Sequence, residues 1–395
     1  MNKRLLRDAD LNGKRVFIRV DFNVPLDPNG NVREETRIRR ALPSIRMALE
    51  KGGRVVLASH LGRPKGKVVP GLSLKPVAER LSQLLGQPVA LAPDCVGSEV
   101  EALVNDLNPG QVLLLENVRY HGGETKNDPV LAEGFSKLAD VVVNDAFGTA
   151  HRAHSSNVGV TRFAGPALAG VLMADEIAYF NRAIRNPNRP VVSILGGAKV
   201  STKIGVIEAL LDRVDKILIG GAMAFTFFKA RGISVGASLV EPEMLDIAAR
   251  AEAAAKQKGV ELLLPVDAVA AAKLEANAET RTVAIEAIPD GWMGLDIGPK
   301  TLETFNQALE GVQTIVWNGP MGVFETPPFN HGTVELAKTV AASPAVSVVG
   351  GGDTDAAVRE AGVADQISYI STGGGAFLEL LEGKELPGIA ALADA

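Results

Sequence analysis

Short apolar, β-rich runs alternate with longer segments of helical periodicity along the whole chain, and this alternation restricts the possible folds more than any other feature. The runs are mostly continuous in apolar character, which is typical of strands buried on both faces of a parallel sheet. Ten strands are predicted, at 16–20, 54–58, 112–115, 141–143, 191–195, 216–219, 261–264, 314–317, 346–349 and 368–370. Helical patterns lie between them, for example at 41–51, 76–85, 204–211 and 243–258.

Strands that alternate with helices predict doubly wound parallel sheets. Ten strands are many for one open sheet. We therefore expect an α/β fold of two doubly wound, Rossmann-like lobes joined by a hinge. The polar stretch 181–190 carries two prolines near mid-chain and is the best linker, which puts the lobes at 1–185 and from 186 onwards. The alanine-rich stretch 268–278 is expected to be an ordinary helix or loop.

Composition restricts the number of domains, the kinds of partner and the cellular location. A length of 395 residues predicts two or three domains. The net charge of −5 does not favour a nucleic-acid or membrane partner. No apolar run approaches the ~20 residues that span a bilayer, and no signal peptide is evident. Cys95 is the single cysteine, so an internal disulfide is excluded, and a cytoplasmic protein is expected.

Four arginines follow the strands predicted in the first half: Arg37, Arg63, Arg119 and Arg152. Because ligands of open parallel sheets bind at the carboxyl ends of the strands, we expect these arginines to share one rim. Guanidinium groups bind carboxylate and phosphate oxygens through paired hydrogen bonds, so the rim indicates a ligand with more than one anionic group. Any one arginine, taken alone, is equally compatible with a solvated surface position. Asp21 is a candidate for holding one of them.

The strands predicted in the second half run into glycine-rich turns, at 196–197, 220–221, 318–320, 350–352 and 373–375. Glycine lets the backbone approach phosphate oxygens, and a following helix offers free N–H groups. Lys199 and Lys203 are four residues apart and would share a helix face. Asp353 follows three glycines, where it would either bind Mg²⁺ or cap the next helix. Neither a P-loop nor a dinucleotide fingerprint is present.

The acids and the nucleophilic or metal-binding residues restrict the chemistry further. Only Asp21 belongs to the arginine rim, whereas a kinase acting on a hydroxyl usually places a carboxylate to accept its proton. This favours an acceptor that is itself a carboxylate. His151 and His154 have no partner at metal-ligand spacing, and His121 and His331 are expected at the surface. Cys95 has no evident histidine partner, so it is not expected to be a nucleophile.

The chain resembles the phosphoglycerate kinase family. The resemblance rests on long ordered motifs spread over the whole chain, among them VFIRVDFNVP at 16–25, SHLGRP at 59–64, LENVR at 115–119, LGGAKV at 195–200, WNGP at 317–320, GGGDT at 350–354 and STGGGA at 371–376. It departs from the family at Phe377, where serine is common.

The resemblance implies a glycolytic step in which 1,3-bisphosphoglycerate and MgADP give 3-phosphoglycerate and MgATP reversibly. It implies Mg²⁺ bound with the nucleotide, small-molecule partners only, and a monomer. The N-terminal lobe, 1–185, would bind the acid and the C-terminal lobe, 186–379, the nucleotide. The segment 380–395 would return to the N-terminal lobe.

The resemblance also assigns residues. Those expected to bind phosphoglycerate are Asp21, Phe22, Asn23, Arg37, His60, Leu61, Gly62, Arg63, Arg119 and Arg152. Those expected to bind the nucleotide are Gly196, Lys203, Gly220, Gly294, Asn318, Glu325, Gly351, Gly352, Asp353 and Thr354, with Glu325 on the ribose and Asp353 on the metal. Those expected to act on the transferring phosphoryl group are Arg37, Lys199, Gly373 and Gly374.

Two other classes of protein share some of these features. A two-lobed solute-binding protein would explain a hinge and an anion rim, but not Lys199, Lys203 and Asp353 among glycine turns. A nicotinamide-dependent dehydrogenase would share the fold, but the dinucleotide fingerprint is missing.

Overall fold

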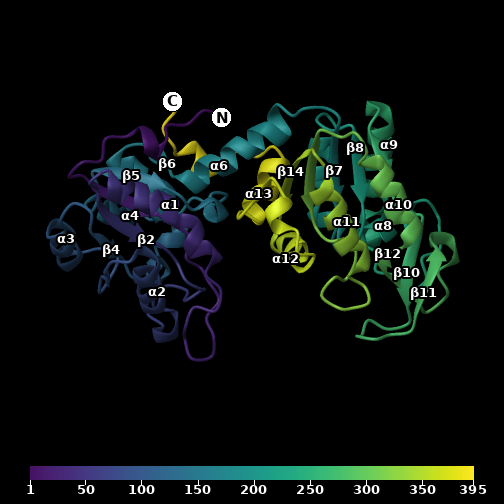
Figure 1. The fold of residues 1–395 in the computed structure, drawn as a ribbon, viewed down its shortest axis with the longest axis horizontal. Coiled ribbons are helices and arrows are strands. Elements are labelled where there is room, and N and C mark those ends of the chain that lie inside the picture. Colours follow the sequence, from purple (N-terminus) through teal and green to yellow (C-terminus); the bar gives the residue numbers. More distant parts are fainter. The chain divides into compact units, whose positions relative to one another are not determined.

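The computed structural model describes residues 1–395 and divides into two compact units (Figure 1). Unit 1 comprises Met1–Ala178 and Glu385–Ala395, and unit 2 comprises Tyr179–Lys384. The chain therefore passes between the units at 178/179 and at 384/385, a few residues from the positions 185/186 and 379/380 that the sequence favoured.

Unit 1 contains a six-stranded sheet in the order β3-β4-β2-β1-β5-β6, with every pair parallel. Its strands are β1 (Arg15–Arg19), β2 (Arg54–Ala58), β3 (Val89–Leu91), β4 (Val112–Leu114), β5 (Val141–Asn144) and β6 (Leu168–Ala169). The strands β3 and β6 are short edge elements that the sequence patterns did not reveal. The central strands β1, β2 and β5 are buried on both faces, which explains their continuous apolar sequences.

Helices cover both faces of this sheet. They are α1 (Thr36–Glu50), α2 (Lys75–Leu85), α3 (Ser98–Asn105), α4 (Pro129–Ser136), α5 (Thr161–Ala164), α6 (Val171–Phe180) and α14 (Pro387–Ala390). On one face Val16 and Ile18 of β1 share a core with Ile45 of α1. Phe17 points to the other face, where its ring lies 5.6 Å from that of Phe135 on α4. This alternation along β1 gives each helical layer its own core.

Unit 2 repeats the plan with a second six-stranded parallel sheet, in the order β15-β14-β13-β7-β8-β9. Its strands are β7 (Val191–Leu195), β8 (Lys216–Ile219), β9 (Glu261–Leu263), β13 (Thr314–Asn318), β14 (Val346–Gly350) and β15 (Tyr369–Ile370). All ten predicted strands are thus present in the two sheets, each within one residue at either end. The predicted α/β fold of two parallel-sheet lobes is confirmed.

The helices of unit 2 are α7 (Ile204–Leu210), α8 (Met223–Ala230), α9 (Leu245–Lys258), α10 (Pro299–Ala308), α11 (His331–Ala342), α12 (Gly352–Glu360) and α13 (Gly375–Leu381). Phe305 of α10 and Leu336 of α11 share a core with Trp317 of β13. The Trp317 ring is fully buried, and its Nε1–H donates to the backbone oxygen of Gly319 at 2.8 Å. That bond satisfies the one polar group that this large side chain brings into the core.

Unit 2 also has a three-stranded antiparallel sheet, in the order β11-β10-β12. Its strands are β10 (Asp267–Ala271), β11 (Thr280–Ala284) and β12 (Met293–Ile297). The expectation of a helix or loop at 268–278 is therefore wrong for its first residues. Alanine has a low strand propensity, but pairing with β11 and β12 on both sides overrides that local preference.

Short 3-10 or π turns connect these elements. They are η1 (Leu6–Asp8), η2 (Pro70–Leu72), η3 (Val118–Tyr120), η4 (Glu124–Lys126), η5 (Phe147–Thr149), η6 (Ser155–Gly159), η7 (Asn181–Arg185), η8 (Val200–Thr202), η9 (Pro242–Met244), η10 (Ile285–Ala287) and η11 (Ala364–Gln366). The stretch predicted as a linker begins as η7, which continues directly from α6.

The last residues of the chain complete unit 1 and bring the two termini together (Figure 1). The Gly388 N–H donates to the oxygen of Ala150 at 2.8 Å, and the Ala393 N–H donates to the oxygen of Ala167 at 2.8 Å. Leu386, Ile389 and Leu392 are buried. These contacts make residues 385–395 part of the unit 1 core.

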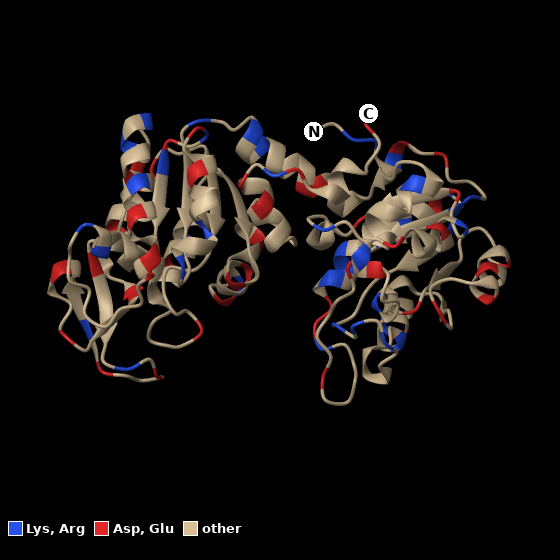
Figure 2. Ribbon diagram, turned by 180° about the vertical axis from the view of Figure 1, so that it is seen from behind, with Lys and Arg blue, Asp and Glu red and all other residues tan.

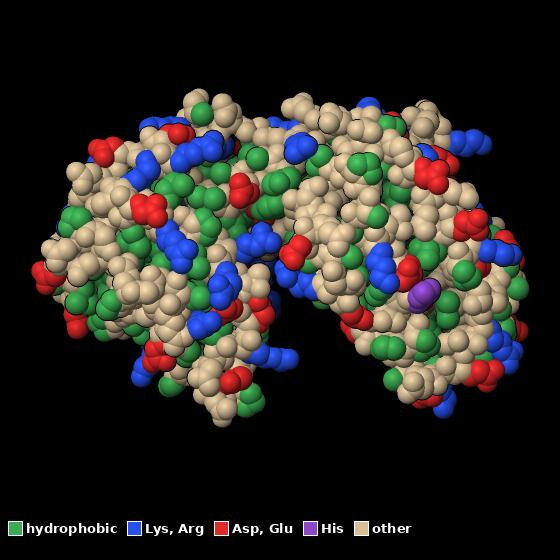
Figure 3. Space-filling view, in the orientation of Figure 1, with side chains coloured by type: hydrophobic (Ala, Val, Ile, Leu, Met, Phe, Trp, Pro, Cys, Tyr) green, Lys and Arg blue, Asp and Glu red, His purple; other side chains and the backbone are tan.

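The surface mixes charges of both signs over both units (Figure 2), consistent with the small net charge. On the face shown in Figure 3, hydrophobic side chains lie in small groups between polar and charged ones. None of the helices is both long enough and apolar enough to cross a membrane.

We expect Ile389→Ala to lower the free energy of unfolding of unit 1 by about 2–5 kcal/mol, because it leaves a cavity where a buried side chain packed. Urea unfolding followed by circular dichroism measures the loss. Trp292 and Trp317 are the only tryptophans and lie in unit 2, so their fluorescence follows that unit separately. Val130→Ala, at a side chain that is 78% exposed, is the matched control. Equal losses in both variants would contradict the packing role of residues 385–395.

Candidate active site

The carboxyl ends of four parallel strands in unit 1 deliver the predicted ligand-binding residues to one edge of the sheet. Asp21 follows β1, His60 follows β2, Arg119 follows β4 and Arg152 follows β5. The parallel register of β1 with β2 and with β5 aligns these ends, since Arg19 pairs with Ala58 and with Asn144. The side chains therefore meet although they are spread over more than a hundred residues of sequence.

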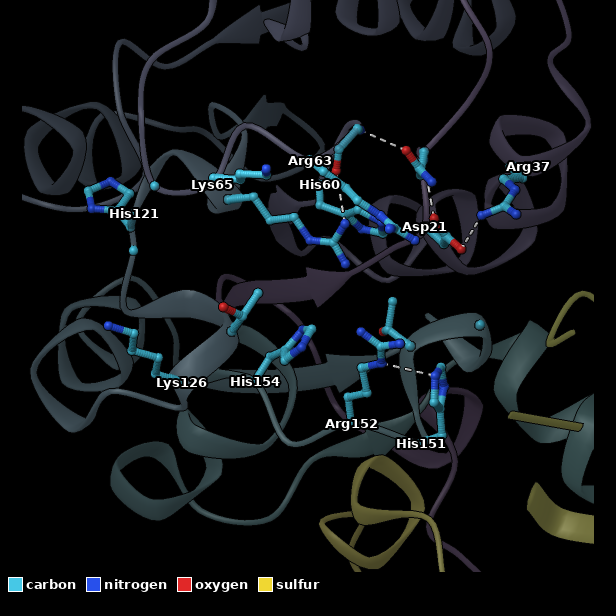
Figure 4. Close-up of a pocket in the computed structure, with 18 residues that line it drawn as sticks. Asp21, Arg37, His60, Arg63, Lys65, His121, Lys126, His151, Arg152 and His154 are labelled. Atoms are coloured by element: carbon cyan, nitrogen blue, oxygen red, sulfur yellow. Dashed lines mark hydrogen bonds and ion pairs between the residues drawn. The ribbon is translucent and has the colours of Figure 1, made fainter. Parts of the chain in front are cut away.

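These side chains line a cavity of about 720 Å³ (Figure 4). Eight of the ten residues predicted to bind phosphoglycerate line it: Asp21, Asn23, Arg37, His60, Gly62, Arg63, Arg119 and Arg152. The other two do not reach it. Phe22 and Leu61 are buried in the hydrophobic core, and their backbone N–H groups already donate to Ser59 and Asn117.

The cavity wall also includes cations and histidines that the sequence patterns did not assign to it. They are Lys65, His121, Lys126, His151 and His154. Lys65 comes two residues after Arg63, and His151 and His154 flank Arg152. Closeness in sequence to these predicted arginines could have indicated that they line the same cavity. His121 is only partly exposed and faces the cavity rather than standing on the open surface.

Hydrogen bonds hold the polar residues of the wall in place. Asp21 accepts from Arg37 Nη1 at 2.5 Å, which confirms that this acid holds an arginine. The Gly62 N–H donates to Asn23 Oδ1 at 2.8 Å, and Arg119 Nη1 donates to the Gly62 oxygen at 2.9 Å. Arg119 Nε is buried and makes no hydrogen bond, so this guanidinium keeps one donor without a protein partner.

A buried charged pair lies beneath the cavity. Arg19 Nε donates to Ser156 Oγ at 2.8 Å, and Ser156 Oγ donates to Glu124 Oε1 at 2.6 Å. The Arg19 and Glu124 side chains are almost fully inaccessible to solvent. Burial lowers the pKa of Arg19 and raises that of Glu124, because desolvation disfavours the charged form of each. The serine thus links two opposite charges that water cannot reach.

Two histidines of the wall, His60 and His154, are held in the neutral form. Burial, followed by the nearby charge of Arg19, lowers the pKa of His60 well below its usual range and that of His154 to about 4. Arg19 Nη2 lies 3.3 Å from His60 Nδ1. A guanidinium only donates, so Nδ1 accepts and the proton of His60 is on Nε2. His60 therefore keeps one N–H donor for a ligand without adding charge.

In unit 2 the residues predicted to bind a nucleotide meet where β13 and β14 end. Lys203 is buried, and its ammonium donates to Asn318 Oδ1. Burial lowers the pKa of Lys203 to about 8, although the charge of Asp353 opposes the shift. Asn318 Nδ2 donates to the Gly350 oxygen at 2.7 Å, and Thr354 Oγ1 accepts from the Gly319 N–H at 2.7 Å. These bonds tie the two glycine-rich turns together.

The predicted glycines stand where a side chain would collide with a neighbour. A Cβ at Gly196 would overlap the Pro320 oxygen, and one at Gly220 would overlap the sulfur of Met321. A Cβ at Gly294 would overlap the Phe225 ring. The cavity bounded by Gly294, Phe225 and Met321 measures only about 10 Å³, too small for a purine. Gly351, which directly precedes α12, has a φ of +98°, a backbone conformation that other residues rarely adopt.

Most of the remaining predicted residues of unit 2 are accessible, but Gly373 is buried. Lys199, Glu325, Gly352 and Asp353 are exposed. Asp353 lies in the first turn of α12, where the helix dipole favours a negative charge. Gly373 and Gly374 precede α13, and Gly374 has a positive φ of +38°.

The surroundings of Cys95 differ from the expectation. His121 and Asp94 lie beside it, with one ligand atom of each of the three residues within 4.8 Å of the others. The sequence showed no histidine partner for Cys95, but the fold brings His121 next to it. The Cys95 thiol is buried, its pKa is raised by that burial, and it donates to the Glu116 oxygen at 3.0 Å. Such a thiol is a poor nucleophile, as predicted.

A cation-lined cavity on one parallel sheet and lysine-bearing glycine turns on the other suit two phosphate-bearing ligands, so the fold and site define an α/β phosphotransferase. The phosphoglycerate kinase family model matches residues 6–384. The phosphoglycerate kinase of Synechococcus elongatus is 57% identical over 401 aligned positions, covering 100% of both chains, and that of Acaryochloris marina is 58% identical, covering 99% of this chain and 98% of its own.

Solved structures agree with these sequence relatives. Phosphoglycerate kinase from Coxiella burnetii superposes with a TM-score of 0.91 at 45% identity, and that from Pyrococcus horikoshii OT3 with a TM-score of 0.84 at 35% identity, each covering 98% of both chains. The chain belongs to the phosphoglycerate kinase family. Its activity is the glycolytic phosphoryl transfer to and from a carboxyl group, as predicted. The family uses Mg-nucleotides, and the solute-binding and dehydrogenase alternatives are set aside.

We expect Glu124→Gln to destabilise unit 1 by about 3–5 kcal/mol, because it removes the only carboxylate hydrogen-bonded to the serine that holds buried Arg19. Urea unfolding followed by circular dichroism measures the change. Glu133→Gln, at an exposed position on α4, should cost less than about 0.5 kcal/mol. If the two substitutions cost the same, the Glu124 charge does not stabilise Arg19.

The pH dependence of stability should report the neutral state of His154. Its folded pKa of about 4 lies below the ordinary value of 6.5, so the unfolded chain binds more protons between these limits. Stability is therefore complete above pH 6.5 and is lost as the pH falls towards 4. We expect His154→Gln to lose about 1–2 kcal/mol less than the parent between pH 7 and pH 5. Parallel losses in parent and variant, from urea midpoints at both pH values, would show that His154 does not titrate in this way.

Proposed function

We propose that the cavity of unit 1 binds the phosphoglycerate substrates and that the strand ends of unit 2 bind the nucleotide. The observation that carries the first assignment is the charge of the cavity. Its wall holds six cations, Arg37, Arg63, Lys65, Arg119, Lys126 and Arg152, and a single carboxylate, Asp21, which is already paired with Arg37. A ligand with both a phosphate and a carboxylate would balance this excess of positive charge.

The same observation bears on the acceptor. In the direction of ATP consumption, a carboxylate oxygen of 3-phosphoglycerate attacks the γ-phosphorus, the bond from that phosphorus to the bridging oxygen of ADP breaks, and ADP departs. The attacking oxygen carries no proton, so no general base is needed. A cavity whose only carboxylate is occupied by an arginine is compatible with this acceptor and unsuited to activating a hydroxyl.

The nucleotide side is assigned on contacts in unit 2. We propose that Lys203, Asn318, Thr354 and the turns at Gly196, Gly220, Gly351 and Gly352 hold the phosphates and nucleoside, that Gly294 lines the nucleoside site, and that Glu325 binds the ribose. Lys203 is buried with its ammonium on Asn318, so an arriving phosphate would exchange a neutral amide for an anionic partner. Because the cavity beside Gly294 is small, nucleoside binding requires Phe225 or Met321 to move.

The residues near Lys203 fit a magnesium ion. Asp353 is an exposed carboxylate whose charge already acts on Lys203. Mg²⁺ prefers oxygen ligands, is often held by one or two carboxylates and keeps waters and nucleotide phosphates as its other ligands. We propose that Asp353 holds it, and that the ion, when bound with the nucleotide, reduces the negative charge of the phosphates.

Charge on the transferring phosphoryl group requires further stabilisers. We propose that Arg37, Lys199 and the backbone N–H groups of Gly373 and Gly374 supply them. Lys199 is exposed, and its ammonium makes no ion pair, so it is available for a ligand.

A monomeric state and a cytoplasmic location stay predictions.

The reaction and its acceptor are tested together by measuring ADP release from MgATP with and without 3-phosphoglycerate, in the presence of hydroxylamine. Acid-dependent ADP with hydroxamate formation is expected, because hydroxylamine traps an acyl phosphate. ADP release that does not depend on the acid, from a folded sample that binds MgATP, would remove phosphoglycerate as the ligand of unit 1.

We expect Lys199→Ala to lower kcat about 10²–10³-fold while changing the Kd of MgADP far less, because the ammonium acts on charge that develops in the transition state. Steady-state kinetics and calorimetric titration with MgADP measure the two effects. Lys273→Ala, an exposed lysine of the same unit, is the control and should leave both unchanged. Near-normal turnover in Lys199→Ala, or equal losses in turnover and binding, would contradict the assignment.

A further inference from the structure

A second concave site lies in unit 2, apart from the residues assigned to the nucleotide. Its volume is about 290 Å³, close to the lower limit for small-molecule pockets. Apolar side chains and cations both line it: Phe180, Ile184, Leu380, Arg185, Arg213 and Lys384. None of these residues belongs to the transfer reaction described above, so the pocket requires its own explanation.

The charges around this pocket do not cancel. The guanidinium groups of Arg185 and Arg213 make no ion pair or side-chain hydrogen bond, whereas Lys384 pairs with Glu382 at 2.5 Å. Two guanidinium groups beside one cavity repel each other, and no protein acceptor takes up their N–H groups. A ligand that supplies anionic oxygens would offset the repulsion and accept hydrogen bonds from both groups.

Glu382 pairs with Lys384 and the charge of Glu379 also acts on it, whereas two other nearby acids have partners outside the pocket. Asp215 accepts from Arg189 Nη1 at 2.6 Å, and Asp212 accepts from Lys258 at 2.7 Å. Gly383 also borders the pocket, where a Cβ would make an ordinary contact with Arg213 Nη2 at 3.7 Å. The pocket thus combines a local excess of positive charge with room for a small molecule.

The residues that line the pocket lie next to the two points at which the chain passes between the units. Phe180, Ile184 and Arg185 follow the point at which the chain enters unit 2, and Leu380, Gly383 and Lys384 precede the point at which it leaves. A ligand that contacts both groups would bridge the two segments through which the units are covalently connected.

We propose that this pocket is a second anion site, which binds a phosphate group through Arg185, Arg213 and Lys384. Guanidinium groups donate paired, charge-assisted hydrogen bonds to phosphate oxygens, and the ammonium adds a point charge. The apolar wall formed by Phe180, Ile184 and Leu380 accommodates a short carbon chain. Inorganic phosphate and a small organic phosphate share the chemistry that the pocket recognises.

The test uses the methyl group of Ile184 as a reporter inside the pocket. Full-length protein with labelled isoleucine methyl groups is titrated with inorganic phosphate and, separately, with glycerol 3-phosphate, and the Ile184 resonance is identified from Ile184→Val. A saturable shift of this resonance is expected with both probes. Tighter binding of glycerol 3-phosphate would assign an organic phosphate, and equal binding would assign the free anion.

Matched variants separate this pocket from the cavity of unit 1, which also attracts anions. Arg185→Ser and Arg213→Ser should each weaken the binding seen at Ile184 about three- to tenfold, and together abolish it. Arg250→Ser, an exposed arginine of α9, should not change it. Arg63→Ser in unit 1 should also leave it intact. No saturable shift, a shift that survives the double substitution, or one lost in Arg63→Ser would overturn the proposal.

Discussion

The parallel pairing of strands is the constraint on which the rest of the structure depends. Each strand of a parallel sheet ends at the same edge as its neighbours, so residues that follow different strands become neighbours in space. In unit 1 this places Asp21, His60, Arg119 and Arg152 around one cavity. In unit 2 it brings Asn318 at the end of β13 next to Gly350 at the end of β14. Both groups of functional residues arise from the same geometrical rule.

The cations around the cavity of unit 1 repel one another. Buried residues next to the cavity offset part of this repulsion. Glu124 places a carboxylate under the arginines, and Ser156 connects it to Arg19. His60 and His154 stay neutral because their pKa values are lowered, which avoids further repulsion. Arg19 orients His60 with its free N–H on Nε2. The positive charge is therefore concentrated in the arginine and lysine side chains that face the ligand.

The phosphate binding that we propose for unit 2 relies on a different feature, the shape of its backbone. Its glycines lie where a side chain would overlap Pro320, Met321 or Phe225, so the turns pack more closely than other residues allow. Lys203 is the one buried cation, and its pKa is lowered because burial removes solvation. A phosphate arriving there would restore the lost electrostatic stabilisation. The pocket around Arg185 and Arg213 adds a third concentration of positive charge, on segments that the reaction does not use.

The sequence by itself determined the α/β class and ten strands of the two parallel sheets, because continuous apolar runs are local signals. It also predicted which edge of each sheet would carry function, from the residues that follow the strands. The motifs added the family. Tertiary structure alone decided that β10 is a strand, since its pairing with β11 and β12 overrides alanine's preference. It alone placed Lys126 and His121 in the cavity wall, excluded Phe22 and Leu61 from it, and brought His121 to Cys95. The reason is physical: which side chain faces a cavity, and which distant one stands opposite, depends on packing between segments that no local pattern records.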